Sequence, residues 1–142
     1  MYNKILIPVE GREGAWRAIR SSTQAVPLLA EDGEILLLHV EESGSQLVAG
    51  SDRKQLKEED DAHGKGRLQP VKDFLDSKSV KYSLLVRKGA IADTIVKTAH
   101  EEEADLIVMF TDGVQNLSEL VFGSITQRVL KNIDIDLLSV RK

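Results

Sequence analysis

Two glycines and a serine near the carboxyl end of the chain have the types and spacing of a backbone anion site. The apolar run 106–110 leads into a polar turn at Gly113, and Gly123 and Ser124 follow after nine intervening residues. Glycine lets the backbone approach a phosphate closely, and the first N–H groups of a helix point outward without internal partners. Ser124 and Gln127 also fit the capping box S-x-x-Q, which predicts that a helix begins at Ser124 and accounts for the serine on its own.

Five short runs with β-rich or apolar composition predict the strands that must position these residues. They are residues 2–9, 34–40, 80–86, 106–110 and 135–140. Runs that are nearly all apolar are typical of parallel sheets covered on both faces. Helical periodicity lies between them, in residues 13–26 (ended by Pro27), 68–75, 91–99 and 125–133. The alternation predicts an α/β fold, a three-layer sandwich with a five-stranded, mostly parallel sheet.

Length and composition exclude several other classes of protein. The chain has 142 residues, a net charge of −4 and no cysteine, so we expect one domain over residues 1–142 and neither disulfides nor thiol catalysis. No basic stretch stands out, and we expect no binding to nucleic acid. No apolar run nears the ~18 residues of a membrane span, so no membrane association is expected. The three histidines have no metal-site spacing, and the P-loop and hydrolase-elbow motifs are absent.

The segment 104–124 resembles the nucleotide-binding signature of the universal stress protein family. That signature is a glycine, two residues, a second glycine, nine residues, a third glycine, and Ser or Thr. Gly113, Gly123 and Ser124 fit its later positions, whereas Phe110 stands where the family has the first glycine. The resemblance covers essentially the whole chain, through KILIPVEG, EILLLHV and ADLIVM. It implies the family's fold, which is that of the adenine nucleotide alpha hydrolases.

The resemblance also implies a binding site for ATP, ADP or AMP at the carboxyl edge of the sheet. Val40 would offer backbone groups to the adenine edge, and Glu10, where the family usually has Asp, would lie beside the sugar and phosphates. The residues implicated as a set are Pro8, Val9, Glu10, Val40, Met109, Gly113, Gly123, Ser124 and Ile125. ATP would usually bring a divalent metal such as Mg²⁺. Any hydrolysis is expected to be slow, because no residue suggests a positioned base or an arginine finger.

Phe110 leaves two alternatives open. If its ring fills the place of the ribose, nucleotide binding is lost; if the ring turns into the core, the site survives. The first function is therefore an adenine-nucleotide-binding module. The second is a nucleotide-independent interaction or scaffold protein of the same fold with a degenerate pocket. An enzyme of the ATP-pyrophosphatase type is less favoured, because Glu10 and Gly11 do not begin a Ser/Gly-rich loop.

The last strand, residues 135–140, predicts how the chain assembles. It should lie at an edge of the sheet, and it contains neither proline nor lysine to prevent pairing with another chain. Two copies meeting about a two-fold axis would bury Leu137, Leu138 or Val140. The resemblance implies the same homodimer through the C-terminal strand. It further implies a stress-linked regulatory role in the cytoplasm, with a protein partner that the sequence does not identify.

Overall fold

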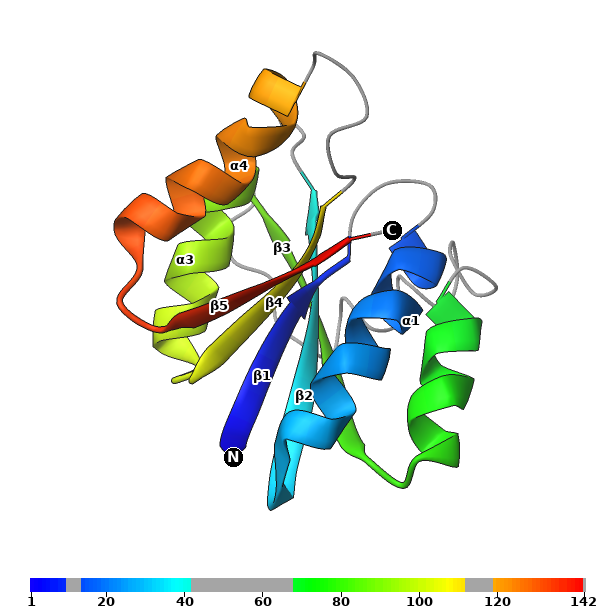
Figure 1. Cartoon of the computed structure of the whole chain (residues 1–142). Helices are drawn as coiled ribbons and strands as arrows, with labels where there is room; N and C mark the ends of the chain where they lie inside the picture. The colour runs from blue at the N-terminus through cyan, green and yellow to red at the C-terminus, as the bar shows by residue number, and fades with distance from the viewer. Residues whose placement is uncertain (10–13, 42–67, 112–118, 142) are drawn as a thin grey trace.

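The computed structural model describes residues 1–9, 14–41, 68–111 and 119–141 (Figure 1). Its elements are β1 (Tyr2–Pro8), α1 (Gly14–Ala25), η1 (Val26–Leu28), β2 (Leu29–Glu41), β3 (Lys81–Lys88), α3 (Ile91–Glu101), β4 (Leu106–Thr111), α4 (Glu119–Asn132) and β5 (Asp136–Arg141). Residues 68–77 are also helical and precede β3. None of the helices in these ranges is long and apolar enough to cross a membrane.

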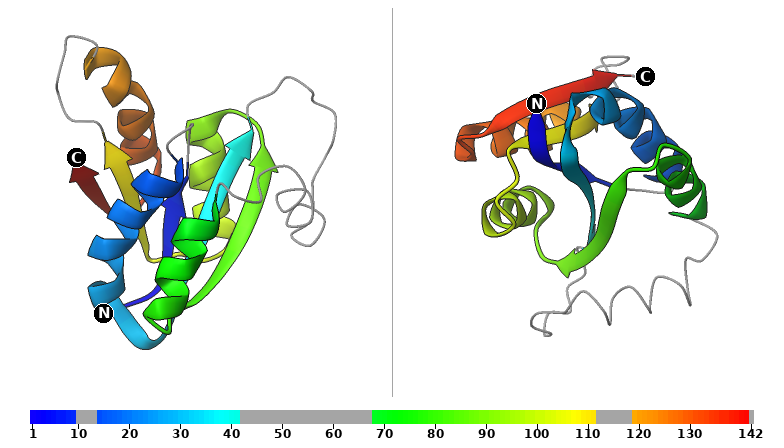
Figure 2. Two further views of the ribbon diagram at one scale, coloured as in Figure 1. Left: turned by 90° about the vertical axis from the view of Figure 1, so that its right-hand side faces the viewer. Right: turned by 90° about the horizontal axis from the view of Figure 1, so that it is seen from below.

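The strands form one parallel sheet in the order β3-β2-β1-β4-β5. Helix α1 and the helix at residues 68–77 cover one face, and α3 and α4 cover the other (Figures 1 and 2). Successive side chains of a strand alternate between the faces, so Val108 packs on the α1 side and Ile107 on the α3–α4 side. The predicted three-layer α/β sandwich is confirmed, and β5 is an edge strand as predicted.

Two predicted boundaries differ from the structure by more than two residues. Strand β2 begins at Leu29, because the chain is already extended after the turn that contains Pro27, and Leu29 pairs with Tyr2. The prediction that a helix begins at Ser124 is wrong: α4 begins at Glu119 and places Gly123 and Ser124 in its second turn. Residues 119–122 include Glu and Leu, which favour helix. The capping-box pattern is a local signal that helix propagation from an earlier turn overrides.

Polar contacts tie together the amino ends of three strands. Both carboxylate oxygens of Asp105 accept backbone N–H groups, those of Asn3 and Lys4, each at 2.9 Å. The Asp105 N–H donates to the Lys4 carbonyl, also at 2.9 Å. The Tyr2 hydroxyl donates to Asp136 Oδ2 at 2.5 Å, and this hydrogen bond raises the pKa of the phenol above its ordinary value of 10.0. The start of β1 is thereby fixed to the starts of β4 and β5.

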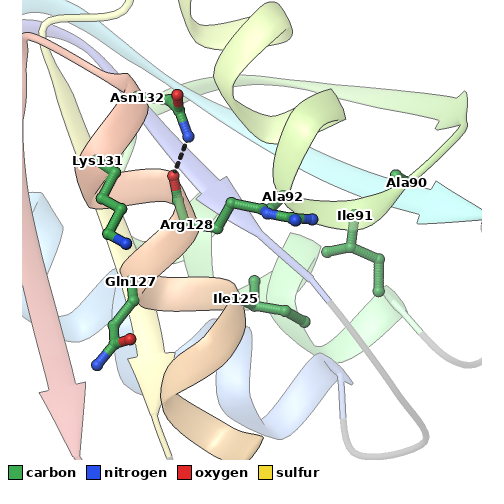
Figure 3. A pocket seen from close by; sticks show the side chains of 8 residues that line it. All are labelled: Ala90, Ile91, Ala92, Ile125, Gln127, Arg128, Lys131 and Asn132. Carbon is green, nitrogen blue, oxygen red and sulfur yellow. Dashed lines mark hydrogen bonds between the residues drawn. The ribbon is translucent and has the colours of Figure 1, made fainter.

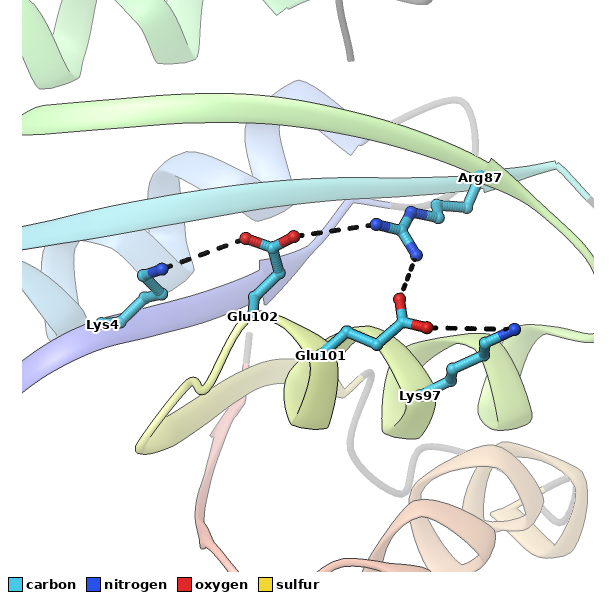
Figure 4. A network of polar contacts seen from close by, with 5 residues as sticks. All are labelled: Lys4, Arg87, Lys97, Glu101 and Glu102. Carbon is cyan, nitrogen blue, oxygen red and sulfur yellow. Dashed lines mark hydrogen bonds and ion pairs between the residues drawn. The ribbon is translucent and has the colours of Figure 1, made fainter. Parts of the chain in front are cut away.

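A second set of polar contacts fixes the end of α3 to the sheet (Figure 4). Arg87 of β3 lies 2.7 Å from Glu101 and 3.7 Å from Glu102. Glu102 also lies 3.9 Å from Lys4 of β1, and Glu101 lies 4.0 Å from Lys97. The hydrogen bond from Arg87 lowers the pKa of Glu101 below its ordinary value of 4.5. These ion pairs link α3 to β1 and β3.

Candidate functional site

The strand order places a topological switch at β1. The ladder between β1 and β2 runs to Pro8 and Leu38. The ladder between β1 and β4 pairs only Ile5 with Leu106 and Leu6 with Ile107, although both strands continue. Ligands of open α/β sheets bind where neighbouring strands connect in opposite directions, outside their carboxyl ends. The carboxyl ends of β1 and β4 are therefore the candidate site.

The end of β1 is held in place from two sides. Val9, which is 3% exposed, donates its N–H to the Leu38 carbonyl at 2.7 Å. Its own carbonyl lies 3.1 Å from Nδ1 of His39, and because a carbonyl only accepts, that nitrogen carries the proton. A side chain at Gly14 would place its Cβ 2.9 Å from Val9, so the first turn of α1 packs closely on this end. These contacts fix where the chain leaves Pro8.

Three of the predicted site residues come together on the α3–α4 side of the sheet. Val40 of β2 is 3% exposed and Met109 of β4 is 6% exposed, and both belong to the apolar cluster under α3 and α4. Ile125 of α4 is half-buried and packs against the same cluster. Apolar side chains from β2, β4 and α4 thus belong to one cluster beside the switch point.

The predicted phosphate-binding residues are only partly placed. Glu10 and Gly113 lie outside the described residues. Gly123 and Ser124 lie in the second turn of α4, where backbone N–H groups bond to carbonyls of the preceding turn. The outward-pointing N–H groups of α4 belong to the turn that begins at Glu119. In this conformation Gly123 and Ser124 do not form the backbone anion cradle that their spacing suggests.

Phe110 lies on the α1 side, away from Val40 and Met109. Its ring is partly buried against the α1-side cluster. The ring centroid lies 5.5 Å from that of Trp16 at an interplanar angle of 68°, and Cζ of Arg17 lies 5.2 Å from the Phe110 centroid. Edge-to-face aromatic pairs and a guanidinium over a ring are both attractive arrangements. Strand alternation places Phe110 on the same face as Val108, a signal that the sequence already contained.

A groove between α3 and α4 was not predicted from the sequence. It has a volume of about 650 Å³, and Ile125 is one of its lining residues (Figure 3). Ala90, Ile91 and Ala92 line it from the start of α3, and Arg128 and Lys131 from α4. The apolar stripe 91–99 and the cations three residues apart in α4 were visible in the sequence. The relative positions of the two helices were not.

Acidic and histidine residues do not gather into a metal centre in the ranges that the structure describes: no group of three or more His, Cys, Asp or Glu there could hold an ion. We therefore assign no metal ligand to any of these residues.

Comparisons with known proteins give one consistent result. The family model described as "Universal stress protein family" matches residues 1–141. Universal stress protein MJ0531 of Methanocaldococcus jannaschii is 31% identical, with 100% of this chain and 84% of the relative covered. Universal stress protein MJ0577 of the same organism is 30% identical, with 100% and 96% covered. The solved structure of MJ0577 superimposes with a TM-score of 0.72 over 100% of this chain and 97% of that one, at 27% identity.

Two further structures share the fold at lower identity. One is a universal stress protein in complex with cAMP, at 17% identity and a TM-score of 0.68, with 99% of this chain and 97% of that one covered. The other is a family protein from Arabidopsis thaliana with AMP bound, at 15% identity and a TM-score of 0.64, with 99% and 91% covered.

Proposed function

The chain belongs to the universal stress protein family, and we propose that it binds an adenine nucleotide at the carboxyl edge of its sheet. The adenine base would lie beside Val40, Met109 and Ile125, close to the end of β1 at Pro8 and Val9. The two similar folds that hold cAMP and AMP support an adenine nucleotide as the ligand class. ATP, with or without Mg²⁺, is the finer proposal.

The observation that carries this proposal is the position of Phe110. Its ring packs on Trp16 of α1, whereas the proposed base-binding side chains lie on the opposite face of the sheet. A phenyl ring in place of the family's first glycine therefore does not occupy the apolar surface assigned to the base. The ring is partly buried against the α1-side core cluster, and this supports the alternative in which the ring turns into the core and the site survives.

Phosphate binding at Gly113, Gly123 and Ser124, with Glu10 beside the sugar, remains part of the proposal. It has one requirement. Because α4 begins at Glu119, the N–H groups of Gly123 and Ser124 become available only if the first turn of α4 unwinds. Glycine has a low helix propensity, so Gly123 is a suitable position for the helix to begin in the nucleotide complex.

Two measurements test nucleotide binding. Mass spectrometry of small molecules released from the purified, denatured protein should detect AMP, ADP or ATP. Calorimetry should then show that Gly123→Val abolishes binding, because a β-branched side chain would intrude on the phosphate approach. Lys131→Val is the matched control, since it places the same side chain at an exposed position of α4. Equal affinity in wild type and Gly123→Val would remove the phosphates from this position.

A second function is favoured by the edge strand. Among the strands that the structure describes, β5 pairs only with β4, and Leu137 and Leu138 are only half-buried. We propose that two copies pair through β5, giving a homodimeric, single-domain regulator in the cytoplasm. It would act in stress responses through a protein partner even if no nucleotide binds.

Sedimentation at micromolar concentration tests the dimer. Leu138→Pro should weaken it strongly, because proline removes a backbone donor and disfavours a strand interior. Leu138→Ala is the control, because it truncates the side chain but keeps the N–H group. A wild type that sediments as a 15.7 kDa monomer, or a dimer that tolerates proline, would contradict the assembly.

A further inference from the structure

The groove between α3 and α4 has an apolar floor and a cationic wall. The floor is made by Ala90, Ile91 and Ala92 at the start of α3 and by Ile125 of α4. Ala92 is buried, Ile91 and Ile125 are half-buried, and Ala90 is exposed. At about 650 Å³ the groove is large enough for several side chains of a ligand.

The wall on α4 is made by two exposed cations, Arg128 and Lys131. Figure 3 shows the Arg128 side chain extending from α4 toward Ala92 and Ile91. Across the part of the chain that the structure describes, no ion pair engages the guanidinium of Arg128 or the ammonium of Lys131. Both charges are therefore available to a ligand in the groove.

The start of α3 adds backbone N–H groups to the same groove, beside one carboxylate, that of Asp93, in the first turn of the helix. Its N-cap is Ala90, whose side chain makes no capping hydrogen bond. The first N–H groups of a helix carry partial positive charge and need acceptors. Arg128 extends toward this positive end, an arrangement that an acidic group between them would stabilise.

We propose that this groove docks a short acidic peptide segment of a protein partner, with apolar side chains on its floor and carboxylates against Arg128 and Lys131. Charge complementarity selects acidic ligands, and clusters of basic residues recognise acidic motifs. The apolar floor selects a peptide over an inorganic anion, which has nothing to bury there. This docking surface shares Ile125 with the proposed nucleotide site, but its charged wall, Arg128 and Lys131, lies outside that site, so docking does not depend on a bound nucleotide.

Fluorescence polarisation with a labelled (Leu-Glu)₃ peptide tests the docking, with (Leu-Lys)₃ as the charge control. The acidic peptide should bind the wild type, and the double variant Arg128→Glu, Lys131→Glu should bind it about tenfold more weakly. The matched control is Lys78→Glu, Lys81→Glu, which makes the same change in net charge on exposed residues outside the groove. Equal binding of both peptides, or equal losses in the two double variants, would overturn the proposal.

Ala90→Asp separates docking from folding, because the two effects have opposite signs. Aspartate is a favoured N-cap, so the variant should melt at a higher temperature than the wild type. Its carboxylate would also occupy the positive end of the groove, so affinity for (Leu-Glu)₃ should fall. Unchanged affinity in a variant that melts higher would contradict the proposal.

Discussion

The amino and carboxyl edges of this sheet are built in different ways. At the amino edge, Asp105 accepts two backbone N–H groups of β1, and Tyr2 donates to Asp136. At the carboxyl edge the ladder between β1 and β4 stops at Leu6 and Ile107, and Phe110 packs on Trp16 beside it. Among the described residues, a carboxylate thus holds the start of β1 at the amino edge, whereas the ladder between β1 and β4 ends before the strands do at the carboxyl edge. Such a division is expected where a rigid scaffold positions a site.

The largest expected effect is at Asp105. Asp105→Ala removes the carboxylate that accepts the backbone N–H groups of Asn3 and Lys4, each at 2.9 Å. Hydrogen bonds to charged groups contribute about 1.5–3 kcal/mol each, and the partial exposure of this pair reduces the sum, so we expect a loss of about 2–4 kcal/mol in the free energy of unfolding. Urea melts measure it.

Asp105→Asn sharpens this test, because the amide keeps one acceptor oxygen and should fall between wild type and Asp105→Ala. Affinity for ATP should change little in either variant, since the residue lies at the opposite edge from the proposed site. A loss below about 1 kcal/mol in Asp105→Ala would show that the amino edge is not the stabilising one.

Phe110 provides the corresponding test at the carboxyl edge. Phe110→Gly should cost about 2–3 kcal/mol, less than a fully buried Phe because the ring is only partly buried. ATP affinity should stay within about twofold, since the ring packs on Trp16 rather than on the α3–α4 side. Phe110→Leu is the control that keeps most of the apolar contact. A large gain in affinity in Phe110→Gly would mean that the ring blocks the ribose.

Much of the fold could be predicted from the sequence, and the reasons are physical. Residues 34–40 are almost all apolar, so this strand must lie between two layers of helices. Pro27 has no backbone N–H group, so it ends α1 whatever the tertiary contacts are. The start of α4 was predicted wrongly, because the cap pattern at Ser124 is a local preference of about 1 kcal/mol that an earlier helical turn outweighs.

The candidate site was harder to predict than the fold. Val40, Met109 and Ile125 were identified through the resemblance, and the structure brings them together. The pairing of Phe110 with Trp16, and the groove between α3 and α4, depend on how elements distant in sequence are oriented. Strand alternation predicts the face on which Phe110 lies but not its partner there.

Two turns at the amino edge of the sheet allow a test of smaller effects on the free energy of unfolding. Glu103 follows α3 with φ 58°, and Ser79 follows the helix at residues 68–77 with φ 57°. In both turns backbone N–H groups bond back to the helix, as Ala104 does to Ala99 and Val80 to Leu75. Glycine is the residue that adopts this conformation without steric cost. Glu103→Gly and Ser79→Gly should therefore each stabilise the fold by about 0.5–1 kcal/mol in urea melts. Destabilisation by either would mean that the native side chain makes a contact worth more than the strain.

The smallest expected effect is the pH dependence of the Arg87–Glu101 pair. The hydrogen bond from Arg87 lowers the pKa of Glu101 below 4.5 in the folded state, so the folded protein binds the proton less readily than the unfolded chain. Its contribution to stability is therefore present above about pH 4.5 and is lost as the pH falls through the folded-state pKa. Glu101 is 45% exposed, so solvent screening limits the contribution to about 0.3–0.5 kcal/mol. Glu101→Gln should lose this amount near neutral pH, and the difference from wild type should shrink below pH 4.5. A difference that persists into acid would mean that Glu101 acts through packing rather than through its charge.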